Sequence, residues 1–296
     1  MTNFTSAPSS VAIQPPEVDA ILASVAAAAE SGNLVFPTTA ELALKVQRLI
    51  DDPDCSIDAL AKLVQADPVL AARVVAVANS VIYNRSGRAI ADVRNAVSRV
   101  GFNTLRVLAA AVVVRQMEGM ARTPAHREIA VRLWHHTAHV AALAQVIARR
   151  FTHVDPDTAF FAGIIHEVGA FYLISRAAKY PGLLEAEHGA LLAWDEGGAA
   201  LVGRAVLKRL GAPAPVMEAI EGMWRGYLAM PPQSLADTLL LADCLAPMES
   251  PLSQLAGKGR EGTEARIDIA LDDQTLSSML EESAAEVESL IGALQS

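Results

Sequence analysis

One apolar segment places the tightest constraint on the fold of this 296-residue chain. Residues 160–174 are as apolar as a core helix, yet His166 and Glu167 lie side by side at their centre. Burying an ionisable pair costs several kcal/mol unless a metal ion, a hydrogen-bond network or a charged partner satisfies it. The fold must therefore bring such a partner to this segment. The identity of that partner decides whether the segment belongs to an enzyme or to a protein without catalytic activity.

Helix signals along the rest of the chain predict an all-α fold. Aromatic residues make up only 5%, and alanine and leucine dominate, which favours helix over sheet. Asp67-Pro68 and Asp155-Pro156 each place an N-cap aspartate before a proline at the first helical position. The pattern predicts helices near residues 17–30, 42–50, 57–64, 69–81, 103–117, 125–151, 182–194, 198–210, 213–224 and 233–247, a helix from Asp155 onward that holds His166 and Glu167, and at most a short strand at 266–271.

Charge is spread unevenly, although the net charge of −9 argues against indiscriminate nucleic-acid binding. From Arg73 to Arg132, ten arginines stand against three carboxylates, a local net of +7. Residues 261–296 carry nine carboxylates against one arginine, a local net of −8. This asymmetry indicates an internal docking surface or an anion site, with a solvated helix face as the plainer alternative. The candidate anion-binding residues flank one loop: Arg85, Arg88, Arg94 and Arg99.

Neither a disulfide scaffold nor a membrane anchor is predicted. Cys55 and Cys244 are too few for a disulfide framework, so we expect free thiols. The longest uninterrupted apolar run, residues 107–114, is too short to span a bilayer. Residues 1–10 lack the basic and apolar regions of a signal peptide. We therefore expect a cytoplasmic protein that does not associate with membranes.

Four ionisable residues on three apolar helices form a candidate site. His136 lies on one predicted helix, His166 and Glu167 on the next, and Asp243 on a much later one. Histidine and carboxylate groups are the usual ligands of a divalent transition metal. A single such residue is more often a satisfied polar group in the core, but three helices that each carry one favour convergence.

Several ordered motifs resemble the HDOD family, the HD-related output domain of bacterial signalling proteins and a degenerate branch of the HD superfamily of metal-dependent phosphohydrolases. The segments at 36–42, 65–70, 78–83 and 100–105 are similar to its most distinctive stretches, and 133–137 resembles its Leu-Trp-x-His-Ser motif, which puts His136 at the first ligand position. The resemblance covers about residues 34–248. Its motif positions, with structural roles implied, are Asp67, Pro68, Asn79, Ser80, Tyr83 and Gly101. Asn79 is expected to clamp the loop at 83–88.

The resemblance implies a compact multi-helix domain over residues 17–248, made of an N-terminal helical subdomain (17–120) and a degenerate HD-like bundle (121–248). A flexible tail (1–16) is expected before it. A linker (249–272) and an acidic amphipathic helix (273–296) are expected after it. We expect that last helix to pack on its own domain rather than to form a dimer.

The chain differs from the HD pattern at residues that would bind the metal and the phosphate. Glu167 stands in place of the family's aspartate and Ala170 in place of its lysine. Frequent histidines are replaced by Ala199 and by Met223-Trp224. Phosphodiester hydrolysis needs metal ions and cationic groups on the phosphate. We therefore expect no catalytic residues, a vestigial cluster of His136, His166, Glu167 and Asp243, and no cofactor; if one binds, a divalent transition metal (iron, manganese or zinc) is expected.

Three functions remain open from the sequence. The favoured one is a non-catalytic signalling or regulatory module that acts through contact with an unidentified partner protein. The second is a metal-dependent phosphohydrolase or phosphodiesterase acting on a nucleotide. The third is a nucleotide or nucleic-acid binder that uses the arginine-rich stretch 73–132; a nucleotide or another small anion is the preferred ligand and nucleic acid is not favoured. A homo-oligomer is compatible with all three.

Overall fold

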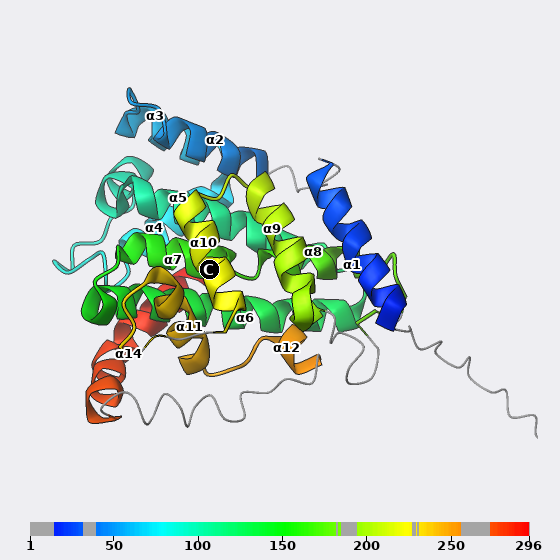
Figure 1. Ribbon diagram of the computed structural model, residues 1–296. Helices are drawn as coiled ribbons and strands as arrows, with labels where there is room; N and C mark the ends of the chain where they lie inside the picture. Colours follow the sequence, from blue (N-terminus) through cyan, green and yellow to red (C-terminus); the bar gives the residue numbers. More distant parts are fainter. Residues whose placement is uncertain are drawn as a thin grey trace, which may run out of the picture.

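The computed structural model describes residues 15–31, 40–181, 183–184, 194–226, 229, 231–255 and 273–295. Within these ranges the chain is a bundle of helices with no strand, so the all-α prediction is confirmed (Figure 1). The predicted tail up to residue 14, the strand candidate at 266–271 and most of the helix predicted at 182–194 lie outside the described residues.

The first half of the chain forms five helices. They are α1 (Pro15–Glu30), α2 (Ala40–Ile50), α3 (Ile57–Gln65), α4 (Pro68–Ala78) and α5 (Val93–Gly119). The predicted cap of α4 is present, because the Asp67 carboxylate accepts a hydrogen bond of 2.8 Å from the Leu70 N–H and Pro68 occupies the first turn. In Figure 1, α2 and α3 lie along one edge of the molecule and α1 packs beside α9.

Helix α5 begins well before the predicted start at residue 103. It contains a break at Gly101, whose φ of 80° and ψ of 174° are not helical. A positive φ costs glycine little because it has no Cβ. The prediction therefore found only the part of α5 that follows the break. Helix α4 was also predicted too long, because it ends at Ala78 rather than near residue 81.

The second half supplies the remaining helices. They are α6 (Pro124–Ile147), η1 (Ala148–Thr152), α7 (Pro156–Ile165), α8 (Val168–Ala177), η2 (Trp194–Gly198), α9 (Ala199–Arg209), α10 (Ala214–Trp224), α11 (Leu235–Leu245), α12 (Pro251–Leu255) and α14 (Asp273–Gln295). Two predictions were wrong. The helix expected to run through His166 and Glu167 breaks at that pair, and the expected linker after residue 248 contains the short helix α12.

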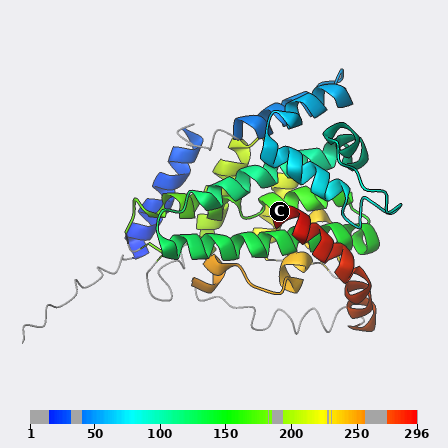
Figure 2. The ribbon, with the colours of Figure 1, turned by 180° about the vertical axis from the view of Figure 1, so that it is seen from behind.

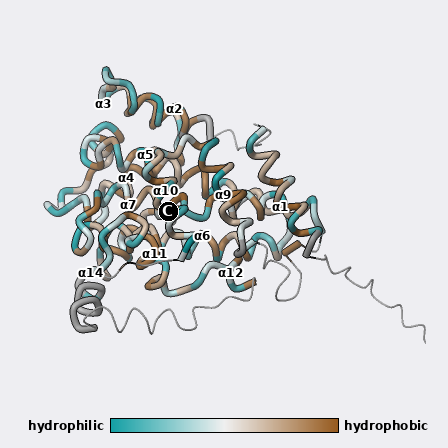
Figure 3. The backbone as a smooth tube through the Cα atoms, in the orientation of Figure 1, coloured by the Kyte–Doolittle hydropathy of each residue, from teal (hydrophilic) through white to brown (hydrophobic). Residues whose placement is uncertain are grey.

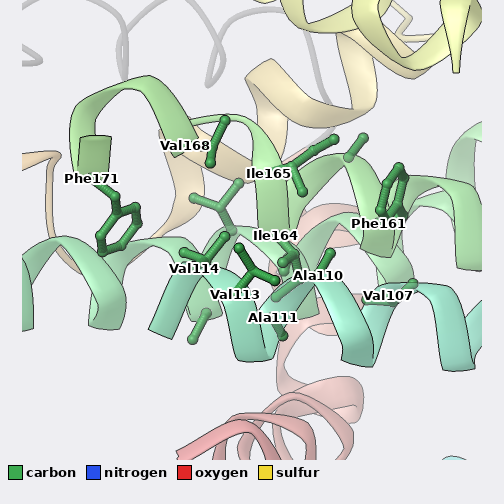
Figure 4. Packing of buried hydrophobic residues seen from close by; sticks show 14 of the residues in the cluster. Val107, Ala110, Ala111, Val113, Val114, Phe161, Ile164, Ile165, Val168 and Phe171 are labelled. Carbon is green, nitrogen blue, oxygen red and sulfur yellow. The ribbon is translucent and has the colours of Figure 1, made fainter. Parts of the chain in front are cut away.

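The core is built around α5, α6, α7 and α8. Figure 4 shows side chains of α5 meeting those of α7 and α8 in an apolar interface that includes Val114, Ile164 and Phe171. The hydropathy colours in Figure 3 alternate between polar and apolar along α2 and α3, as expected for amphipathic helices at the edge of the bundle. Buried apolar residues of both halves belong to one continuous cluster. The division into two subdomains at residue 120 stays a prediction.

Two apolar stretches are long enough to cross a membrane. Val93–Gly119 and Pro156–Ala177 meet the criteria of length and mean hydropathy for a membrane-spanning helix. Polar residues interrupt both stretches, so the length of the longest uninterrupted apolar run does not reveal them. However, 67% and 83% of their most apolar windows are buried inside the protein. The core helices of globular proteins pass the same test, so these stretches are only weak evidence for a membrane.

The last helix packs on its own domain, as predicted. Figure 2 shows α14, in red, lying across the side of the bundle that includes α4 and α6. Leu290 and Leu294 are fully buried there. The Ser289 hydroxyl accepts a hydrogen bond of 3.1 Å from the Val81 N–H, and Glu286 pairs with Arg149 at 3.0 Å and Arg150 at 3.4 Å. The side chains of Leu276 and Leu280 lie outside the described part of the chain.

Candidate metal centre

The paired ionisable residues lie at a helix break. Helix α7 ends at Ile165, His166 follows it, and Glu167 precedes the first residue of α8 with φ −107° and ψ 20°. The Glu167 side chain makes no capping hydrogen bond to α8. The break frees this carboxylate from the helix surface and turns both residues toward α6 and α11.

His166 presents one ring nitrogen to the centre. Its Nδ1–H donates to the Gly163 carbonyl, one turn earlier, at 2.7 Å. Its Nε2 is buried without a hydrogen-bond partner. Burial lowers the pKa of His166, and the nearby His136 adds to that effect, although Glu167 and Asp243 oppose it. The ring is therefore neutral, with the Nε2 lone pair exposed to the centre.

His136 on α6 has the same arrangement. Its Nδ1–H donates to the Met248 carbonyl at 2.9 Å, and its Nε2 points toward the carboxylates. Burial alone would lower the pKa of His136, but Asp243 and Glu167 raise it to about 9. The two imidazole rings lie 5.7 Å apart between centroids and are tilted by 55°.

Two carboxylates complete the cluster. Asp243 Oδ1 on α11 lies 3.1 Å from His136 Nε2, and Glu167 Oε2 lies 3.6 Å from the same atom. Despite these distances, His136 Nε2, His166 Nε2 and Glu167 Oε2 have no hydrogen bond of acceptable geometry. The predicted hydrogen-bonded cluster is therefore incomplete. The longer side chain of Glu167 nevertheless reaches the centre.

This donor set fits a divalent metal. The potential ligand atoms of His136, His166 and Asp243 all lie within 4.8 Å of one another, and Glu167 adjoins them. Metal-bound histidines usually donate the second ring N–H to a carbonyl or carboxylate, which fixes the ring and its tautomer. Both histidines here do so. The Nε2 atom of His166 and the Oε2 atom of Glu167 are buried acceptors without a hydrogen bond, and a cation would satisfy both.

The surroundings differ from those of a phosphate-handling site. Ala170 is buried and brings no charge. Next to Ala170, the backbones of α8 and α9 approach each other so closely that a Cβ on Gly169 would lie 2.7 Å from Gly203 Cα. The Trp224 ring fills the space on the other side of Gly203. The methyl group of Ala170 and the indole of Trp224 thus occupy positions where the resemblance leads one to expect polar side chains.

The other motif residues serve the fold. The Asn79 side-chain amide donates to the carbonyl of Ile90 at 2.7 Å and accepts from its N–H at 2.8 Å, so it holds the chain just after the predicted loop at 83–88. The Tyr83 hydroxyl contacts Thr104, Asp157 and Gln145, which joins the turn after α4 to α5, α7 and α6. Ser80 is buried, and its carbonyl accepts the N–H of Tyr83.

Two of the four candidate anion-binding arginines bind groups of the protein itself. Arg94 pairs with Asp58 at 2.5 Å. Arg99 donates to two backbone carbonyls, at 3.1 and 3.0 Å, and so braces the same loop. Arg85 and Arg88 are exposed on that loop.

Sequence reasoning missed the groups that orient the histidines. The Gly163 carbonyl is one turn before His166, so helical spacing contains a signal for it. The Met248 carbonyl lies far from His136 in the sequence, and no pattern links the two.

Comparison with known families gives one match over most of the chain: the family profile described as HDOD domain matches residues 36–223. Comparison with curated proteins gives no match.

Solved structures share the fold. A candidate metal-dependent phosphohydrolase from Shewanella amazonensis superimposes with a TM-score of 0.65 at 23% identity, covering 94% of this chain and 99% of that one. An HDOD domain protein of unknown function from Geobacter sulfurreducens gives 0.61 at 24% identity, covering 93% and 98%. A candidate signal transduction protein from Marinobacter aquaeolei gives 0.55 at 18% identity, covering 96% and 69%.

Proposed function

Because this chain belongs to the HDOD family, we propose that it is a regulatory module of bacterial signal transduction that binds one divalent transition metal and does not hydrolyse phosphodiesters. It acts in the cytoplasm through contact with a partner protein. The observation that carries the proposal is the convergence of the potential ligand atoms of His136, His166 and Asp243 within 4.8 Å of one another. Glu167 adjoins them.

The metal part of the proposal rests on electrostatics. The sequence led us to expect no cofactor, but unsatisfied buried lone pairs are costly. A cation held by His136, His166, Glu167 and Asp243 would remove that cost and join α6, α11 and the α7–α8 break. A bound iron, manganese or zinc ion would supply Lewis acidity there.

The absence of hydrolysis is proposed from the groups around this donor set. Four donors suit one metal ion, whereas the resemblance implies five or more ligands for two ions in full HD enzymes. Phosphoryl chemistry also needs cations that neutralise developing charge on the phosphate. Ala170 stands where the family pattern has a lysine, and Trp224 stands where it has a histidine.

The alternative is a metal-dependent phosphohydrolase. One observation favours it: the side chains of Asp243 and Glu167 are 28% and 16% exposed, so the centre is open to solvent on the carboxylate side. The Shewanella amazonensis neighbour is a candidate metal-dependent phosphohydrolase, but its likeness to this chain supports the fold alone.

Metal content and hydrolysis, measured on the same preparation, test the proposal. The full chain is purified without chelator, its metals are quantified by mass spectrometry, and it is incubated with bis-p-nitrophenyl phosphate and cyclic dinucleotides in added Mn²⁺ or Fe²⁺. We expect about one metal per chain and no turnover. Metal-dependent hydrolysis that disappears in Glu167→Gln would establish the alternative. A metal-free protein that also fails to bind added Zn²⁺ or Mn²⁺ would overturn the metal site.

Metal binding should release a proton at neutral pH. Without metal, His136 stays protonated up to about pH 9, so the ion must displace that proton. We expect the affinity to rise by up to about tenfold per pH unit as the pH approaches that pKa from below, and to level off above it. Calorimetric titrations in two buffers of different ionisation enthalpy should show release of about one proton per metal. Binding that is independent of pH in this range would contradict the assignment of His136.

A further inference from the structure

The last helix, α14, is amphipathic and carries an apolar seam. Val287, Leu290, Ile291 and Leu294 follow the spacing i, i+3, i+4 and i+7, which places them along one side of the helix. Leu290 and Leu294 are fully buried, and Val287 and Ile291 pack against the same core cluster. The 23 residues of α14 also include five carboxylates and no lysine or arginine. This element is therefore an acidic helix that docks on the bundle through its apolar side.

Polar contacts fix the position of the docked helix. The Glu286 carboxylate lies 3.0 Å from Arg149 Nη2 and 3.4 Å from Arg150 Nη2, both in the short η1 that continues α6. The Ser289 hydroxyl accepts a hydrogen bond of 3.1 Å from the Val81 N–H, in the turn after α4. We call the sides of α4 and α6 that α14 covers, together with Val81, Arg149 and Arg150, the α14-binding face (Figure 2). An apolar surface flanked by cations is complementary to an acidic amphipathic helix.

The contacts that hold α14 are weaker than those of a core helix. The side chains of its ion pairs are between 20% and 31% exposed, and partly exposed pairs contribute little to stability. Ser283 and Ala293 occupy buried positions of the docked side but bring little apolar area. The outer side of α14 is exposed, for example at Ala285 and Glu288, so the helix lies on the surface of the bundle. Elements with few buried contacts open at low free energy.

The α14-binding face adjoins both helices that lead to the metal centre. Helix α6 contributes to the face directly and carries His136. Two residues after Val81, the Tyr83 hydroxyl donates to Asp157 in the first turn of α7 at 3.1 Å. Helix α7 ends immediately before His166. A protein bound to this face would therefore contact the elements that position both histidines.

We infer that the α14-binding face is the surface on which a partner protein docks an acidic amphipathic helix, and that α14 is an internal competitor for the same face. The inference rests on the proposed function for the existence of a partner, but not for the metal or for the absence of hydrolysis. Because α14 belongs to the same chain, its effective concentration at the face is high, and it closes the face until a partner displaces it. The partner helix needs apolar residues at i, i+3, i+4 and i+7 and a carboxylate that reaches Arg149 and Arg150.

Binding of the α14 sequence in trans tests the inference. A fluorescein-labelled synthetic peptide of residues 273–296 is titrated with the full chain, and its anisotropy is measured for the wild type, Glu286→Gln and the control Glu288→Gln. Glu286→Gln removes the ion pairs from the internal helix but not from the peptide, so a larger fraction of the face is free to bind. We expect the apparent affinity to rise by about fivefold or more. Glu288 is exposed, so its variant should bind the peptide as the wild type does.

A second peptide tests the charge of the partner helix. It has the same sequence except for Glu286→Lys, which places a cation beside Arg149 and Arg150. We expect it to bind the Glu286→Gln protein at least about tenfold more weakly than the unchanged peptide, because like charges at an interface repel. Equal binding of the two peptides would contradict the assignment of an acidic partner.

Three further results would overturn the inference. A Glu286→Gln protein that does not bind the peptide saturably would show that the face serves only the fold. Equal affinities of the wild type and Glu286→Gln would show that α14 does not control access. Light scattering on the same samples identifies the third, a Glu286→Gln dimer that excludes the peptide, in which a second copy of the chain is the occupant.

The test does not depend on one variant or on the metal. If Glu286→Gln does not fold, Ser289→Ala takes its place, since it removes only the hydrogen bond to Val81. The apparent peptide affinity should again exceed that of the wild type, and an unchanged affinity would count against the inference. Peptide binding is measured apart from metal content and hydrolysis, so its failure would remove this surface and leave the proposed metal centre standing.

Discussion

Replacing His166 by glutamine should lower the affinity for Zn²⁺ or Mn²⁺ by about 100-fold or more. The substitution removes a neutral imidazole whose Nε2 is buried and unsatisfied and whose orientation is fixed by the Gly163 carbonyl. Glutamine keeps a polar side chain but not the fixed nitrogen lone pair. Competition with a chromogenic chelator at constant pH measures the change.

The control is His139→Gln on α6. The His139 Nδ1–H donates to the His135 carbonyl at 2.7 Å within its own helix, and the residue is not among the candidate ligands. We expect its metal affinity to equal that of the wild type. Equal affinities of all three proteins would remove His166 from the centre, whereas a loss in both variants would point to a general disturbance of α6 and α7.

Gly163→Ala should destabilise the protein by about 2 kcal/mol, although alanine is the better helix former. A Cβ on Gly163 would lie 2.5 Å from the Ala141 Cα and 3.0 Å from its nitrogen. These are backbone atoms, so α7 must move away from α6. The resulting overpacking costs about 3 kcal/mol and outweighs the gain of about 1 kcal/mol in helix propensity. Urea unfolding measures the difference.

Gly119→Ala provides the matched control, because a Cβ there meets nothing within 4 Å. We expect that variant to be as stable as the wild type or slightly more so. Gly163→Ala should also weaken metal binding, since the Gly163 carbonyl orients His166. A Gly163→Ala protein as stable as Gly119→Ala would show that the α6–α7 contact is looser than these distances indicate.

Local signals in the sequence predicted most of the fold. Start signals such as Asp67-Pro68 depend on neighbouring residues only, and the helices they predict begin where expected. The part of α5 before Gly101 was missed, because polar residues interrupt its apolar pattern. The break at His166 and Glu167 was also missed, because it lies in a continuous apolar segment that helical periodicity reads as one helix.

The sequence identified which residues form the candidate site, but it did not predict how they are hydrogen-bonded. His136, His166, Glu167 and Asp243 were identified as lone ionisable residues on apolar segments, and the structure brings them together. Their hydrogen bonding depends on the Met248 carbonyl and on the helix break, neither of which has a pattern in the sequence.

The docking of α14 has a consequence for the order of folding. The hydrogen bond between Val81 and Ser289 joins residues 208 positions apart. Closing so long a loop is entropically unfavourable until the intervening helices have packed, so this contact forms late. On a chain emerging from the ribosome, the faces of α4 and α6 that α14 covers stay open until α14 itself has been synthesised.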